Sequence, residues 1–146
     1  MVKQGTWYCP TMTPYYSHWA PADTPAGKRD RARVAVHGPS LQKAMKAGVK
    51  IVFGTDVGGF SWTEPIAQEF KRMAEFGMSP ADAIRTATVS AAEMLGMAGE
   101  IGVIAPGAYA DIVAVPGDPL SDLGVLEKVS FVMKDGRIFK DASGRH

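Results

Sequence analysis

The chain has 146 residues, of which 46% are hydrophobic and 21% charged, a size and composition typical of one globular domain. The 16 Lys and Arg against 15 Asp and Glu give a net charge of +1, so neither nucleic acid nor an anionic membrane is an expected partner. The single cysteine excludes an intrachain disulfide and a multi-cysteine metal site. With no leader-like or membrane-spanning apolar run, we expect a cytoplasmic protein.

The first half of the chain predicts two short strands with a helix between them. Residues 6–9 are β-branched and aromatic, which is typical of a buried strand. Residues 10–39 contain five prolines and predict a long loop that either has a functional role or contacts a missing part of the protein. Ser40 is a candidate N-cap for a short helix that ends at Gly48. Residues 50–53 are too short for a helix and predict a buried strand of the parallel kind.

Two further helices are predicted after the second strand. One begins at Thr63 and ends at Gly77, with its apolar side chains on one face. The other has Ser79 as N-cap and Pro80 at its first position, and continues to Gly96.

Beyond residue 99 the hydrophobic pattern changes from helical to extended. The dipeptide Asp135-Gly136 is typical of a two-residue hairpin turn that needs positive φ at both positions. The predicted strands are residues 101–104, 110–115, 129–133 and 137–140.

Asp56 is the first candidate functional residue, because it follows the second strand on a glycine-rich loop. Catalytic groups of α/β proteins stand at this position, where the strand fixes the backbone and the loop leaves room for substrate. The carboxylate could bind a divalent metal and accept the proton of a metal-bound water. The local residues leave open the alternative that Asp56 merely stabilises its own turn.

Three segments between about Gln42 and Lys140 form a recognisable pattern. They are residues 47–56, residues 77–84 and, most specifically, the Pro-Gly-x-x-Ala-Asp segment within residues 102–119. With these segments the chain resembles the C-terminal end of the metal-dependent amidohydrolase superfamily, in particular its imidazolonepropionase-like and Xaa-Pro dipeptidase-like members.

This resemblance implies an α/β fold, namely the last two βα units of a metal-dependent hydrolase (β/α)8 TIM barrel plus the C-terminal strands of a small composite β-sandwich. Residues 6–9 and 50–53 would be barrel strands seven and eight. Residues 1–98 would form the barrel part and residues 99–146 the sandwich part.

The resemblance also implies a function. Asp56 would bind one or two divalent metal ions, zinc in the first place, and shuttle a proton while a carbon–nitrogen bond of an amide, dipeptide or cyclic amide is hydrolysed. Thr11, Gly58, Trp62 and His37 would lie near this small-molecule substrate.

The remaining metal ligands of the family have no counterpart in this sequence. The histidines are His18, His37 and His146, and none forms a His-x-His pair. A complete barrel needs about 250 residues. We therefore expect a C-terminal piece of a hydrolase that is inactive by itself. The alternative is a non-catalytic, truncated chain that needs a complementing chain or a second copy to complete the barrel.

Overall fold

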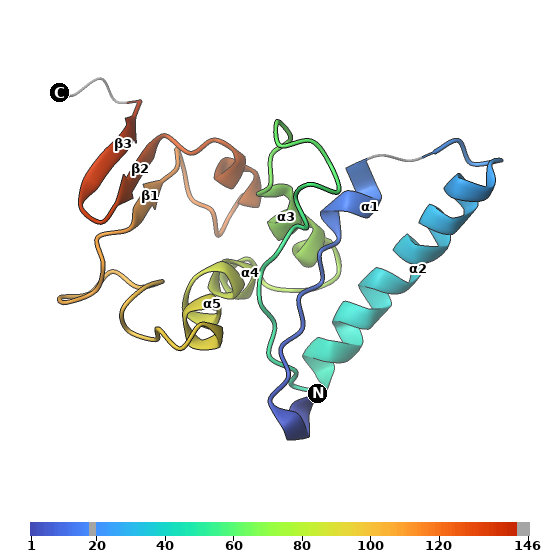
Figure 1. The fold of residues 1–146 in the computed structure, drawn as a ribbon, viewed down its shortest axis with the longest axis horizontal. Coiled ribbons are helices and arrows are strands. Elements are labelled where there is room, and N and C mark those ends of the chain that lie inside the picture. The colour runs from blue at the N-terminus through green and yellow to red at the C-terminus, as the bar shows by residue number, and fades with distance from the viewer. Residues whose placement is uncertain (18–19, 143–146) are drawn as a thin grey trace.

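The computed structural model describes residues 1–17 and 20–142, which form a mixed α/β structure (Figure 1). An antiparallel sheet lies at one end and the long helix α2 (Pro25–Lys46) at the other. Between them lie α3 (Gln68–Glu75), α4 (Pro80–Ala87) and α5 (Val89–Met94). The N-terminal segment carries η1 (Val2–Gln4) and α1 (Thr13–Ser17).

Helix α2 corrects the prediction of a loop over residues 10–39 and of a helix start at Ser40. The helix begins at Thr24, whose hydroxyl oxygen accepts the Gly27 N–H at 3.0 Å, with Pro25 at the first helical position. It continues through Pro39, although proline removes a helical hydrogen bond. Its predicted end is confirmed, because Gly48 has a φ of 70° just beyond the C-cap.

Helix α3 begins five residues later than Thr63, its predicted start. The preceding turn bonds each N–H to the carbonyl three residues earlier, as in Gln68 N to Pro65 O at 3.2 Å, so it is not α-helical. Met73 lies on the buried face as expected, whereas Ile66 is 48% exposed.

The N-terminus of α4 is confirmed in detail. Ser79 Oγ accepts the Asp82 N–H at 3.1 Å and donates to Asp82 Oδ2 at 2.6 Å. The predicted single helix is instead interrupted at Thr88, where φ is −122° and ψ is −98°, and α5 follows.

The sheet has the order β1 (Ile112–Ala114), β2 (Phe131–Lys134) and β3 (Arg137–Asp141), with both pairings antiparallel. The turn between β2 and β3 is confirmed, since Asp135 and Gly136 have φ values of 49° and 74°. The short η2 (Leu123–Glu127) precedes β2 and contacts α3.

The predicted strand at residues 101–104 is wrong. Ile101 makes one isolated bridge to Ala98, and Gly102 then turns the chain with a φ of 73°. A β-carbon at Gly102 would lie 2.5 Å from the Thr88 carbonyl oxygen, so the chain passes too close to α5 for an extended strand with side chains.

The buried core lies among the helices rather than in the sheet. Its members are Met12, Leu41, Met73, Met78 and Ala83. Among the described residues, no helix is long and apolar enough to cross a bilayer.

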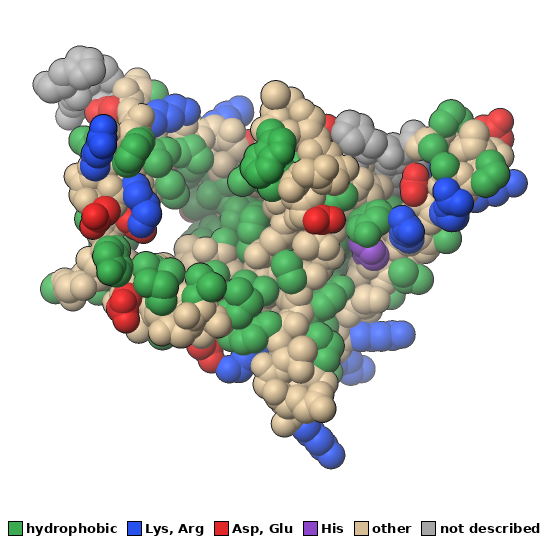
Figure 2. Space-filling model, viewed as in Figure 1, with side chains coloured by type: hydrophobic (Ala, Val, Ile, Leu, Met, Phe, Trp, Pro, Cys, Tyr) green, Lys and Arg blue, Asp and Glu red, His purple; other side chains and the backbone are tan. Residues whose placement is uncertain are grey.

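Hydrophobic side chains also remain on the surface. On the face seen in Figure 2 they gather over α5 and the segment that follows it. Trp62 is 77% exposed and Ile104 87%. Such exposure of large apolar side chains is typical of a surface that another segment or chain covers.

Candidate active site at two strand ends

Residues 6–9 and 50–53, which are predicted as strands, form no strand in the structure; the two segments lie side by side and make one isolated parallel bridge. Tyr8 pairs with Ile51 in a parallel bridge. The Tyr8 N–H donates to Lys50 O at 2.9 Å, and the Val52 N–H donates to Tyr8 O at 3.0 Å. Because parallel segments end at the same edge, the loops that carry Thr11 and Asp56 lie together.

The contact between these loops is close. A β-carbon placed on Gly54 would lie 2.3 Å from Cys9 Sγ and 3.7 Å from Thr11 Cγ2, so a larger residue there would force the Cys9 thiol to move. Thr11 and Asp56 both have positive φ, 44° and 53°. Non-glycine residues rarely adopt this conformation, and such strain concentrates at functional sites.

Asp56 itself is exposed, and the turn around it is closed by its backbone. Its carbonyl oxygen accepts the Gly59 N–H at 3.0 Å. Among the residues that the structure describes, no donor reaches the carboxylate. The carboxylate oxygens of Asp56 are therefore available to a ligand, rather than occupied in an Asx turn.

Glu69 is the carboxylate that the sequence does not predict as a site residue. It lies in the first turn of α3 and is fully buried. Its Oε1 accepts the Met12 N–H at 2.9 Å, and its Oε2 accepts the Thr13 N–H at 2.8 Å and the Thr13 hydroxyl at 2.6 Å. The available signal is its position four residues before buried Met73, on the apolar face of an amphipathic helix.

The electrostatics connect both carboxylates to Cys9. Burial raises the pKa of the Cys9 thiol, and the negative charges of Glu69 and Asp56 raise it further. Burial also raises the pKa of Glu69, against its hydrogen bonds from Met12 and Thr13, which lower it. The Cys9 thiol is therefore close enough to both Glu69 and Asp56 for their charges to affect its pKa.

Of the other predicted substrate contacts, Gly58 lies in the Asp56 turn and His37 lies on helix α2. Gly58 has a φ of 112°, and the indole of Trp62 is mostly exposed nearby in sequence. The His37 ring is edge-on to the Tyr15 ring with 4.5 Å between ring centroids. Burial and the charge of Arg33 lower the pKa of His37. His18 and His146 lie outside the described residues.

The described part of the chain does not by itself fit a metal ion. It contains no group of three His, Cys, Asp or Glu side chains placed to hold one, whereas a catalytic zinc commonly has three protein ligands. Asp56 can supply one oxygen donor.

Comparison with known proteins identifies the family. Residues 1–139 match the profile of the Amidohydrolase family. An imidazolonepropionase from Ralstonia nicotianae is 35% identical over 105 residues, which are 67% of this chain and 25% of that protein. An adenine deaminase from Moorella thermoacetica is 41% identical over 75 residues, which are 51% of this chain and 11% of that protein.

Solved structures agree with these matches. The crystal structure of a Xaa-Pro dipeptidase with methionine bound in its active site gives a TM-score of 0.83 at 32% identity, over 96% of this chain and 36% of that one. The A. niger ochratoxinase gives 0.79 at 32% identity, over 99% of this chain and 34% of that one. The chain thus spans about a third of the length of these structures.

Proposed function

Because the chain belongs to the amidohydrolase family, we propose that it supplies the Asp56-bearing part of a hydrolase that cleaves a carbon–nitrogen bond. The substrate class is a small amide, dipeptide or cyclic amide. Residues 6–9 and 50–53 are then the seventh and eighth strands of a barrel, and residues 99–146 belong to a β-sandwich.

The observation that carries this proposal is the pair of strand ends. A parallel bridge aligns the two segments, and the loops that follow hold Thr11 and Asp56 in left-handed conformations. An exposed carboxylate without an internal donor, fixed at the end of one of these segments, can accept a proton from a water that attacks a bound amide. Thr11 and Gly58 are the nearest candidates to contact that substrate, and Trp62 and His37 are more distant candidates.

The proposal includes a metal ion only as a partner that Asp56 would bind. The family is generally metal-dependent, and Asp56 would provide a single ligand to a divalent ion such as zinc. The described residues supply no group of further ligands around Asp56, so no catalytic step is routed through the ion.

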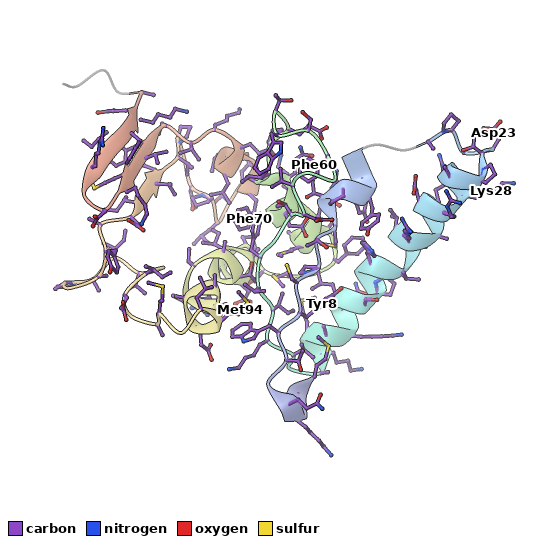
Figure 3. All side chains as sticks on the ribbon, in the orientation of Figure 1. Tyr8, Asp23, Lys28, Phe60, Phe70 and Met94 are labelled. Carbon is purple, nitrogen blue, oxygen red and sulfur yellow. The ribbon has the colours of Figure 1, made fainter. Side chains whose placement is uncertain are left out.

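The test uses the polypeptide as its source cell produces it. Hydrolysis of dipeptides ending in proline and of imidazolonepropionate is followed by the release of product. Asp56→Asn should reduce kcat by about 10²–10⁴-fold, the usual contribution of a general base. Asp23→Asn is the matched control, since Asp23 lies just before the N-terminus of α2, away from the Phe60 and Phe70 side chains (Figure 3), and should leave kcat unchanged. Activity that survives Asp56→Asn would refute the proposal.

A second candidate function is non-catalytic pairing with a complementing chain or a second copy. The exposure of Trp62 and Ile104 favours it, because large apolar side chains are usually covered. The native mass distinguishes the cases: a stable complex well above 15.6 kDa supports pairing, and a lone 15.6 kDa species contradicts it.

A further inference from the structure

Glu69 is buried at a cost that its packing does not explain. Transfer of a carboxylate out of water is unfavourable, and an apolar residue could fill the same space beside Met73 without that cost. What an apolar residue could not do is accept the hydrogen bonds from Met12 and Thr13. The carboxylate is therefore used to fix the backbone that follows residues 6–9.

That backbone lies near the Asp56 turn. A β-carbon placed on Gly59 would lie 3.8 Å from Pro14 Cβ and 3.6 Å from Asp56 Oδ2. Pro14 follows Thr13 directly in α1, which Glu69 holds through two of its three hydrogen bonds. A displacement of α1 would thus move Pro14 away from the turn that carries Asp56.

The residue after Glu69 contacts the segment of residues 50–53. The Phe70 ring packs on the Phe53 ring with 4.3 Å between centroids, three residues before Asp56. Two consecutive side chains of α3 therefore contact both segments, Glu69 by hydrogen bonds and Phe70 by ring packing.

We propose that Glu69 is a positioning residue for Asp56: it fixes Met12 and Thr13, and through them the loop against which the Asp56 turn rests. This inference rests on the proposed hydrolase function, because positioning Asp56 matters for catalysis only if Asp56 acts in hydrolysis. The simpler alternative is that Glu69 only stabilises the short helix α1, with no effect on where Asp56 stands.

The thiol of Cys9, the single cysteine of the chain, reports the position of Asp56 without any assay of catalysis. Its pKa is measured from the pH dependence of alkylation in the full chain as purified. Because the Asp56 charge raises this pKa, Asp56→Asn should lower it. In a Glu69→Gln background, the same Asp56→Asn change should lower the Cys9 pKa much less, because the turn has moved away from the thiol.

The control variants separate position from general stability. Glu75→Gln, on the same helix but exposed and paired with Arg72, should leave the effect of Asp56→Asn intact. Thr13→Val removes one of the bonds to Glu69 and should reproduce part of the Glu69→Gln result, whereas Thr13→Ser keeps the hydroxyl and should behave as the parent. Thr13→Val also serves if Glu69→Gln does not fold.

The outcomes are distinct. An equal drop of the Cys9 pKa in the parent and in both Glu69→Gln and Thr13→Val backgrounds would overturn the positioning role. If Asp56→Asn no longer lowers the Cys9 pKa in the Glu69→Gln background, and Glu69→Gln lowers kcat but preserves KM, both the positioning role and the hydrolase function are supported. If that effect on the Cys9 pKa is lost but the protein hydrolyses none of the substrates, the positioning role is supported and only the proposed hydrolase function is refuted.

Discussion

Gly38 provides a quantitative test of how α2 packs on the rest of the molecule. Gly38 is buried within α2, and a β-carbon added there would lie 2.0 Å from Phe76 Cε1 and 2.1 Å from Cδ1. Ordinary carbon contacts are about 3.5–4.0 Å, so the Phe76 ring would have to retreat by about 1.5 Å. The ring is packed against the core, and this retreat disturbs its neighbours.

The net effect of Gly38→Ala is the difference of two opposing contributions. Alanine in a helix interior is about 1 kcal/mol more favourable than glycine, whereas overpacking a filled site costs about 1–3 kcal/mol. Because the ring edge is met by the full β-carbon, we expect the upper end of this cost and a net loss of about 2 kcal/mol in the free energy of unfolding.

Urea unfolding of the full chain measures this loss, with Ser40→Ala as an exposed control in the same helix. In a Phe76→Leu background the clash is relieved, so Gly38→Ala should there stabilise by about 1 kcal/mol. An equal destabilisation in both backgrounds, or a stabilisation in the parent, would refute the contact between Gly38 and Phe76.

Three further changes test the cap, the sheet and the buried acid. Ser79→Ala removes the N-cap of α4 and should cost about 1 kcal/mol in urea unfolding; an unchanged midpoint would contradict the cap. Hydrogen bonds from Lys134 and from the Asp135 N–H lower the pKa of Asp111 below 3.8, so its stabilisation is present above pH 3.8 and is lost as the pH falls through the folded-state pKa. Asp111→Asn should flatten this part of the acid unfolding curve. Burial raises the pKa of Glu69 above 4.5, so the folded state binds its proton more tightly and stability falls as the pH rises through the folded-state pKa. Glu69→Gln should abolish that fall, as measured by thermal unfolding from pH 4.5 to neutrality, and an unchanged slope would show that other groups cause it.

The elements that the sequence predicts correctly are those set by neighbouring residues. The Ser79-Pro80 start of α4 and the Asp135-Gly136 turn need only local hydrogen bonds and local φ values. Asp56 closely follows residues 50–53, and its role as a site residue stays a prediction.

Helix α2 shows how a local signal can be obscured. Thr24-Pro25 is the same type of start as Ser79-Pro80, but Gly27, Gly38 and Pro39 argue against a helix of this length. Gly27 is explained only by the fold, since a β-carbon there would lie 2.1 Å from the Pro21 carbonyl oxygen. Gly38 is explained likewise by Phe76, which is distant in sequence.

The local pattern places Glu69 on the apolar face of its helix but cannot identify its hydrogen-bond partners, because they are 56 and 57 residues away. The role of Glu69 is explained by the strained backbone of Thr11, the residue before its two hydrogen-bond partners. Asp135 owes its positive φ to a hairpin turn, but Thr11 is β-branched and holds a φ of 44° without one. Such a residue costs about 1–3 kcal/mol and persists only when its surroundings impose it. The hydrogen bonds of Glu69 to the next two residues, each worth about 1.5–3 kcal/mol for a charged acceptor, can impose it. The buried Glu69 and the strained Thr11 therefore belong to one arrangement, and Pro14, two residues after Met12, lies near Gly59 of the turn that carries Asp56.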